Sequence, residues 1–145
     1  MIEKKIDEIQ KEIIEEFSYF DDWMDKYELL ITLGNELPLI DEKYKTDNKL
    51  IKGCQSQVWM HAEEREGKVY YSADSDAVIT KGLVSMVIKV LSGHEPEAIT
   101  QADLFFIREI GLQNHLSPTR SNGLLAMIKQ MKLYAMALQQ QKIKS

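Results

Sequence analysis

The chain has 145 residues and a formal net charge of −5, and its mass of 16.8 kDa is enough for one folded domain over residues 1–145 with a single core. With 44% hydrophobic and 28% charged residues, its composition excludes a disordered or low-complexity chain. The negative charge excludes strong unspecific attraction to phosphate backbones or anionic lipids, so we expect neither nucleic acid nor a membrane as partner.

The first two helices are predicted from hydrophobic spacing and from capping residues. Apolar residues recur at intervals of three and four along one face of the first helix: Ile2, Ile6, Ile9, Ile13 and Phe17. A second helix is expected to begin at Asp21 or Asp22, either of which is a good N-cap, and to end at Gly34.

The charged N-terminus lacks the apolar stretch of a secretory signal, which predicts a cytoplasmic protein.

The middle of the chain is expected to form a small antiparallel sheet. Residues 38–57 show no helical period and contain a short candidate strand at Leu50-Ile51. Residues 58–63 and 69–73 alternate between apolar and polar side chains around a turn at residues 64–68, which predicts a β-hairpin. Together these segments predict three antiparallel strands.

The C-terminal half is expected to be helical. Asp74, Ser75 and Asp76 are candidate caps for a helix over residues 77–91, whose apolar stretch from residue 82 is too short to span a bilayer. Residues 96–111 predict a shorter helix, and a last helix is expected to follow residues 117–122. The fold class is therefore α+β, a small three-stranded antiparallel sheet packed against several helices.

The single cysteine, Cys54, is the main candidate for chemistry. One thiol cannot close an internal disulfide, and iron–sulfur clusters and structural zinc sites take several ligands, so we expect no metal and no cofactor. Cys54 precedes the first hairpin strand, where a rigid sheet can position it. Its neighbours offer a flexible backbone and hydrogen-bond donors: Gly53, Gln55, Ser56 and Gln57. From the residues alone, a reactive thiol and a small buried core residue are equally supported.

A nucleophilic thiol benefits from a nearby cation, because an ordinary thiol of pKa about 8.5 is mostly protonated at neutral pH. Arg120 is a candidate, since a positive charge near the start of a helix opposes the helix dipole and calls for another explanation. From the residues alone, an Arg120 that fastens a loop through Asp74, Asp76 or backbone carbonyls is favoured. His61 and His115 are candidate bases.

Three segments, taken together and in this order, resemble the SufE family of sulfur acceptors. They are Gly53-Cys54-Gln55-Ser56-Gln57-Val58-Trp59, then Asp74-Ser75-Asp76-Ala77 with Lys81-Gly82-Leu83, then residues 115–124 with the sequence HLSPTRSNGL. The resemblance covers nearly the whole chain and implies an α+β fold like that of the IscU scaffold proteins. Gln55-Ser56-Gln57 is more similar to SufE than to its paralogue CsdE, without separating the two.

The resemblance also implies a function. Cys54 matches the family's acceptor cysteine, which takes a sulfur atom from the persulfide of a SufS-like cysteine desulfurase, stimulates that enzyme and passes the sulfur toward the SufBCD scaffold for iron–sulfur cluster assembly. Arg120 matches the arginine of the SPxRS-type motif, near the thiol or the desulfurase surface. Asp74 and Asp76 match a segment whose loop lies by the cysteine loop. A homodimer stays open.

Three other functions stay open at this point. A scaffold that assembles clusters itself would need ligands from a second copy, because this chain has one cysteine. A stand-alone cysteine enzyme would use Cys54 with His61 or His115. A structural adaptor would keep Cys54 in its core. The covalent relay predicted by the resemblance needs only an accessible sulfur and a partner's persulfide.

Overall fold

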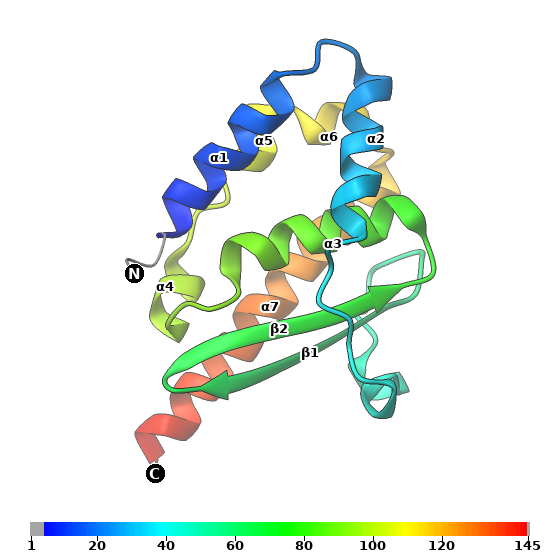
Figure 1. Ribbon diagram of the computed structural model, residues 1–145. Helices are drawn as coiled ribbons and strands as arrows, with labels where there is room; N and C mark the ends of the chain where they lie inside the picture. The colour runs from blue at the N-terminus through cyan, green and yellow to red at the C-terminus, as the bar shows by residue number, and fades with distance from the viewer. Residues whose placement is uncertain (1–4, 145) are drawn as a thin grey trace.

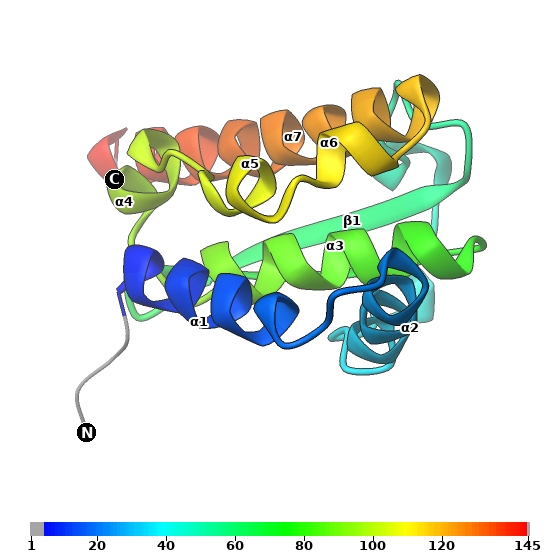
Figure 2. The ribbon, with the colours of Figure 1, turned by 90° about the horizontal axis from the view of Figure 1, so that it is seen from above.

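The helix α3 (Val78–Leu91) occupies the centre of the fold in the computed structural model, which describes residues 5–144 (Figure 1). Ten of its fourteen residues are buried, because α1, α2, strand β2 and α7 all pack against it. Figure 2 shows α3 between α1 and α7. The most apolar segment of the sequence thus forms the central core helix, with Val78 and Lys89 left exposed. Across residues 5–144, no helix is long and apolar enough to cross a membrane.

The two N-terminal helices confirm their predicted apolar faces and cap. In α1 (Ile6–Ser18), the spacing of three and four buries Ile6, Ile13 and Phe17, whereas Ile2 lies outside the described residues. In α2 (Trp23–Gly34), the N-cap is Asp22, whose carboxylate accepts a hydrogen bond from the Met24 N–H at 3.0 Å.

The predicted hairpin is confirmed and is longer than expected. Strands β1 (Val58–Arg65) and β2 (Lys68–Ser75) pair antiparallel, and a turn of two residues, 66 and 67, joins them. Both turn residues have positive φ, which suits the twist of a tight hairpin.

The expected third strand is wrong. Within residues 5–144 the sheet has two strands, and Leu50 makes only a single bridge to Trp59, with the Ile51 N–H donating to the Val58 carbonyl at 2.9 Å. The short helices η1 (Glu42–Tyr44) and η2 (Asp47–Lys49) occupy the chain before Leu50. The turn at Gly53, with φ +94°, follows at once. The extended segment between these features is therefore too short to form a ladder.

The single helix expected over residues 96–111 is also wrong, because a buried glutamine divides it. The structure has α4 (Pro96–Gln101) and α5 (Phe106–Ile110), with extended backbone at Ala102. Gln10 is fully buried in α1, and its amide donates to the Asp103 carbonyl and accepts from the Phe106 N–H, each at 3.0 Å. These bonds satisfy the backbone groups that the break exposes, a contact that periodicity does not show.

The long helix α7 (Pro118–Lys144) follows α6 (Leu112–His115) and packs against α4, α3 and the hairpin (Figures 1 and 2). Two tyrosines fix it there. The buried Tyr71 hydroxyl of β2 donates to the Met131 carbonyl at 2.7 Å, and the Tyr134 hydroxyl of α7 donates to the Met60 carbonyl of β1 at 3.3 Å. These bonds fix the middle of α7 to the hairpin.

Candidate functional site

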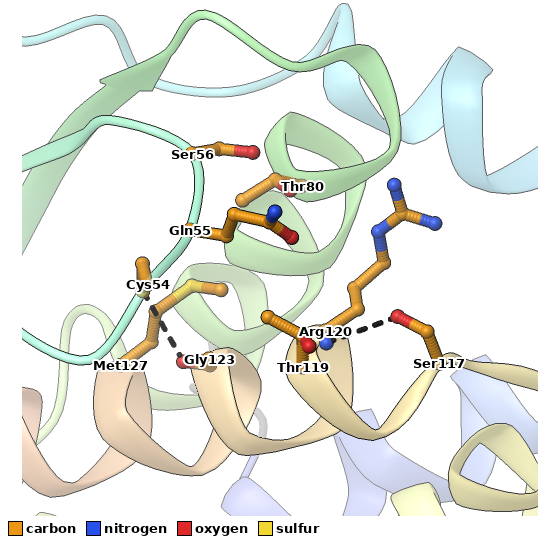
Figure 3. A pocket seen from close by; sticks show the side chains of 9 residues that line it. All are labelled: Cys54, Gln55, Ser56, Thr80, Ser117, Thr119, Arg120, Gly123 and Met127. Atoms are coloured by element: carbon orange, nitrogen blue, oxygen red, sulfur yellow. Dashed lines mark hydrogen bonds between the residues drawn. The ribbon is translucent and has the colours of Figure 1, made fainter.

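Cys54 lies half-buried on the loop between η2 and β1, against the first turns of α7 (Figure 3). Its thiol donates to the Gly123 carbonyl with a sulfur–oxygen distance of 3.5 Å. A Cβ at Gly123 would also lie 3.5 Å from the sulfur, so the missing side chain leaves the thiol in contact with bare helix backbone. Gly53 supplies the positive φ of the turn that brings the loop this close.

A small hollow opens beside the sulfur. Its volume is about 40 Å³, which holds one or two water-sized groups and is far below the ~300–1,000 Å³ of sites for ordinary small-molecule substrates. Two segments and one residue of α3 line it: Cys54, Gln55 and Ser56 from the loop, Ser117, Thr119, Arg120, Gly123 and Met127 at the start of α7, and Thr80. The hollow therefore suits an extra atom on the thiol better than a separate substrate molecule.

Burial raises the pKa of the Cys54 thiol. The residues lining the hollow include no histidine, aspartate or glutamate, so nothing in it acts as an obvious base toward the sulfur. The resting protein therefore keeps Cys54 mainly as the neutral thiol at pH 7.

We expect iodoacetamide to alkylate native Cys54 with a midpoint at higher pH than in the urea-unfolded chain, because burial disfavours the thiolate that reacts. The measurement is the alkylation rate from pH 6 to about 10.5, followed by mass spectrometry. The unfolded chain, whose thiol has the ordinary pKa near 8.5, is the reference. A native midpoint at or below that of the unfolded chain would contradict the protonated resting state.

Asp76 connects the cysteine loop to the segment that follows β2. Its carboxylate accepts from the Gln57 N–H at 3.1 Å, and its own N–H donates to the Gln57 carbonyl at 3.3 Å. Of the site residues predicted from the sequence, Gln57 and Asp76 are thus in direct contact. The expectation that these aspartates cap α3 is wrong, because the N-cap is Ala77, which has no side-chain cap bond. Asp76 uses its carboxylate to fasten the end of the cysteine loop.

Asp74 lies in a cluster of charges at the same end of the hairpin. Its carboxylate is 2.7 Å from the ammonium of Lys45 and 3.5 Å from that of Lys81, and it accepts from the Ser75 N–H at 2.8 Å. Burial alone would raise the pKa of Asp74, but the hydrogen bonds from Lys45 and Ser75 and the two positive charges lower it below its usual range. Asp74 therefore anchors the η1 segment to the hairpin.

We expect Asp74→Asn to lower the free energy of unfolding at pH 7 by about 1 kcal/mol. A carboxyl whose folded pKa is lowered stabilises the fold above its unfolded pKa of about 3.9, and this contribution disappears as the pH falls through the folded pKa. The free energies of unfolding of the wild type and the variant, measured in urea, should therefore converge only as the pH falls below the lowered pKa of folded Asp74. Asp47→Asn, at an exposed position without an ion pair among residues 5–144, is the control. A difference that persists at low pH would contradict the electrostatic cause.

Arg120 lines the hollow, but its charged end does not contact the sulfur. In the view of Figure 3 its side chain extends away from Cys54. The backbone N–H of Arg120 donates to Ser117 Oγ at 3.2 Å, the cap that starts α7 just before Pro118. Within residues 5–144 its guanidinium forms no ion pair with Asp74 or Asp76 and no hydrogen bond to a backbone carbonyl. The loop-fastening role favoured by the residues alone is therefore wrong, and the exposed charge is free to meet a partner.

The two histidines lie away from the thiol. His61 stacks on Tyr44 with ring centroids 3.8 Å apart, and burial, together with the charge of Lys49, lowers its pKa. His115 stacks on Trp23 at 3.7 Å. Neither lines the hollow, so the structure does not form the cysteine–histidine pair that a stand-alone enzyme would use.

Several lining residues were missed by the sequence. Thr119, Gly123 and Met127 share one helical face with Arg120, and this spacing, applied to the SPxRS-type motif, would have found them. Thr80 carries no such signal, because only packing brings α3 to the hollow.

In the described part of the chain, no three histidine, cysteine, aspartate or glutamate side chains lie close enough together to hold a metal ion.

Residues 11–135 match the sequence model of the SufE family, described as an Fe-S metabolism associated domain. The chain belongs to the SufE family. It is 39% identical over 126 residues to an uncharacterized SufE-like protein of Rhizobium meliloti, covering 83% of this chain and 90% of that one. It is 40% identical over 128 residues to an uncharacterized SufE-like protein of Synechocystis, covering 88% and 80%. The resemblance seen in the three motifs is confirmed.

Two further comparisons concern length and fold. The chain is 41% identical over 130 residues to SufE-like protein 1, chloroplastic/mitochondrial, of Arabidopsis thaliana, and spans 89% of its own length but 35% of that relative's. A solution structure of a hypothetical protein from Thermus thermophilus superposes with a TM-score of 0.74 at 21% identity, over 89% of this chain and 94% of that one. This likeness confirms the mixed α+β fold. As a SufE-family member, the chain has a role in Fe-S metabolism.

Proposed function

We propose that this protein is a sulfur acceptor and shuttle, in which Cys54 takes a sulfur atom from the persulfide of a SufS-like cysteine desulfurase and delivers it to a SufBCD-like scaffold. The observation that carries the proposal is a half-buried thiol beside a hollow of about 40 Å³. The match to a family associated with Fe-S metabolism supports the same chemistry. The persulfide adds one S–S bond of about 2.05 Å to the thiol, which such a hollow can contain.

The transfer is a thiol exchange at sulfur. The Cys54 thiolate attacks the outer sulfur of the donor persulfide, a new S–S bond forms on Cys54, and the donor's own S–S bond breaks. The donor cysteine leaves as a thiolate and takes up the proton that Cys54 gave away, so no external oxidant or reductant is needed. Because burial raises the pKa of Cys54, we propose that contact with the desulfurase supplies the environment that removes this proton.

The hollow favours this accessory role over a stand-alone enzyme. It has no acid–base side chain and no room for a substrate of ordinary size. A protein that only carries sulfur needs neither, because the desulfurase performs the chemistry that releases sulfur from cysteine. Arg120, exposed at the mouth, is a candidate contact for that partner.

Mass spectrometry of the intact protein tests the proposal directly. After incubation with a SufS-like desulfurase, its pyridoxal phosphate and cysteine, we expect a mass increase of one sulfur atom, removed by a reducing agent and located on Cys54 by peptide analysis. Omission of cysteine is the control. An unmodified mass, or sulfur on a residue other than Cys54, would refute the assignment. A homodimer and a cytoplasmic location stay predictions, to be tested by light scattering and by cell fractionation.

A further inference from the structure

A second, larger pocket lies on a different face of α7 from the Cys54 hollow. Its volume is about 380 Å³, within the ~300–1,000 Å³ range of small-molecule sites. It opens between the first half of α7 and residues 102–108, the segment that joins α4 to α5 and begins α5. Figure 2 shows this segment running alongside α7. The break that Gln10 imposes between the two short helices therefore also forms one wall of the pocket.

The lining of this pocket is mainly apolar. Five aliphatic side chains from its two walls face it: Leu104 and Ile107 on one side, and Leu124, Leu125 and Ile128 on α7. Leu125 is 62% exposed, so this wall of the pocket opens to solvent. Residues 121, 124, 125, 128 and 132 repeat the same helical spacing as 120, 123 and 127 but start one residue later, so they lie about 100° further round α7 than the residues that face the hollow.

The charges at the rim sum to one positive charge. Arg108 and Asp103 pair with each other at 3.1 Å and neutralise one another. The Lys132 ammonium donates to the Ala102 carbonyl at 2.6 Å, which holds it at the pocket, and it has no ion pair with any residue between 5 and 144. Two of its three N–H donors are left for other acceptors. In a chain of net charge −5, this is a local preference for an anion.

The Ser121 hydroxyl is a second polar group at the pocket. Ser121 belongs to the lining, and its hydroxyl oxygen is buried with no hydrogen-bond partner among the described residues. Buried hydroxyls are normally hydrogen-bonded. Rotation about its single side-chain torsion can turn this hydroxyl toward the pocket.

We propose that this pocket binds an amphipathic carboxylate: an apolar chain or ring among the leucine and isoleucine side chains, with the carboxylate at Lys132. A cation would be repelled by the Lys132 ammonium, and a neutral apolar compound would leave that charge without a counter-ion. A fully polar anion would leave the aliphatic walls uncovered. The ligand class therefore follows from the combination of volume, apolar lining and one net positive charge, independently of the function proposed for Cys54.

Three probes of equal chain length test the charge preference: octanoate, octanol and octylamine. Titration into the isotopically labelled protein, followed by NMR, should shift resonances of residues 102–108 and 121–132. We expect octanoate to bind about tenfold more tightly than octanol, the difference given by one charge-assisted hydrogen bond, and octylamine to bind more weakly than either. Equal affinities of the three probes, or shifts confined to other parts of the chain, would overturn the proposal.

Three variants separate the pocket from the rest of the protein. Lys132→Met keeps the apolar stem and should reduce octanoate binding to the level of octanol. Leu125→Glu changes an exposed residue, so the fold should persist while the new charge repels octanoate. Cys54→Ser should bind octanoate as the wild type does, because the hollow lies on another face of α7. Undiminished octanoate binding by Leu125→Glu would refute the location even if Lys132→Met failed to fold.

Discussion

Cys54→Ser will lose all sulfur acceptance from a cysteine desulfurase and will keep the fold. A serine hydroxyl is almost fully protonated at neutral pH and does not form the S–S bond on which the transfer depends. The change is nearly isosteric, and a serine hydroxyl can still donate to the Gly123 carbonyl that the thiol contacts. We therefore expect complete loss of the sulfur adduct, with less than about 1 kcal/mol change in the free energy of unfolding.

Radiolabelled cysteine gives the measurement, since sulfur carried by the protein can be counted after gel filtration without reductant. Ser56→Ala is the matched control, because Ser56 lines the same hollow and carries no nucleophile that the mechanism needs. It should accept sulfur as the wild type does. Persistent labelling of Cys54→Ser would show that another residue is the acceptor and would end the proposed mechanism.

Gly82→Ala will destabilise the fold by about 2–3 kcal/mol, although alanine is the better helix former by about 1 kcal/mol. The reason is the crossing of α2 and α3. A Cβ at position 82 would lie 2.3 Å from the Leu30 carbonyl oxygen, and Gly34 on α2 faces Gly82 closely as well, its own Cβ position 3.1 Å from the Gly82 nitrogen. The obstacle is backbone, so one helix must move to make room.

Urea unfolding at constant pH measures this cost. Gly123→Ala is the matched control, since it places the same methyl group in a helix where the nearest atom, Cys54 Sγ, is at an ordinary contact distance of 3.5 Å. Because alanine is the better helix former, the free energy of unfolding of Gly123→Ala should equal that of the wild type or exceed it by up to about 1 kcal/mol. Equal effects of the two substitutions would show that the α2–α3 crossing tolerates a side chain.

The elements predicted correctly are those whose signal is local. The spacing of Ile6, Ile13 and Phe17, the cap at Asp22 and the alternation in residues 58–75 all act through neighbours in the chain. The errors have a different origin. The break in residues 96–111 depends on Gln10, more than ninety positions away. No strand forms at Leu50 because the flanking turns leave an extended segment that is too short to pair.

The candidate site divides in the same way. Cys54 and its neighbours were predicted as the site because chemistry restricts a lone thiol to few roles and because three motifs resemble one family, and the structure places Cys54, Gln55 and Ser56 together at the hollow. The partners of the aspartates were not found. Lys45 and Gln57 are the partners of Asp74 and Asp76, where the residues suggested helix caps or bonds to Arg120 and the resemblance implied only that this segment lies by the cysteine loop.

The sequence by itself singled out Cys54 as the candidate reactive residue, because it is the one cysteine and lies in a motif that resembles one family, and it determined the helices and hairpin that local periodicity encodes. Only the tertiary structure decided how deeply the Cys54 sulfur is buried and which residues surround it. The volume beside Cys54, its raised pKa and the outward direction of Arg120 arise from α3, α7 and the loop packing together. Burial and desolvation depend on every neighbouring atom, and no window of sequence contains those neighbours.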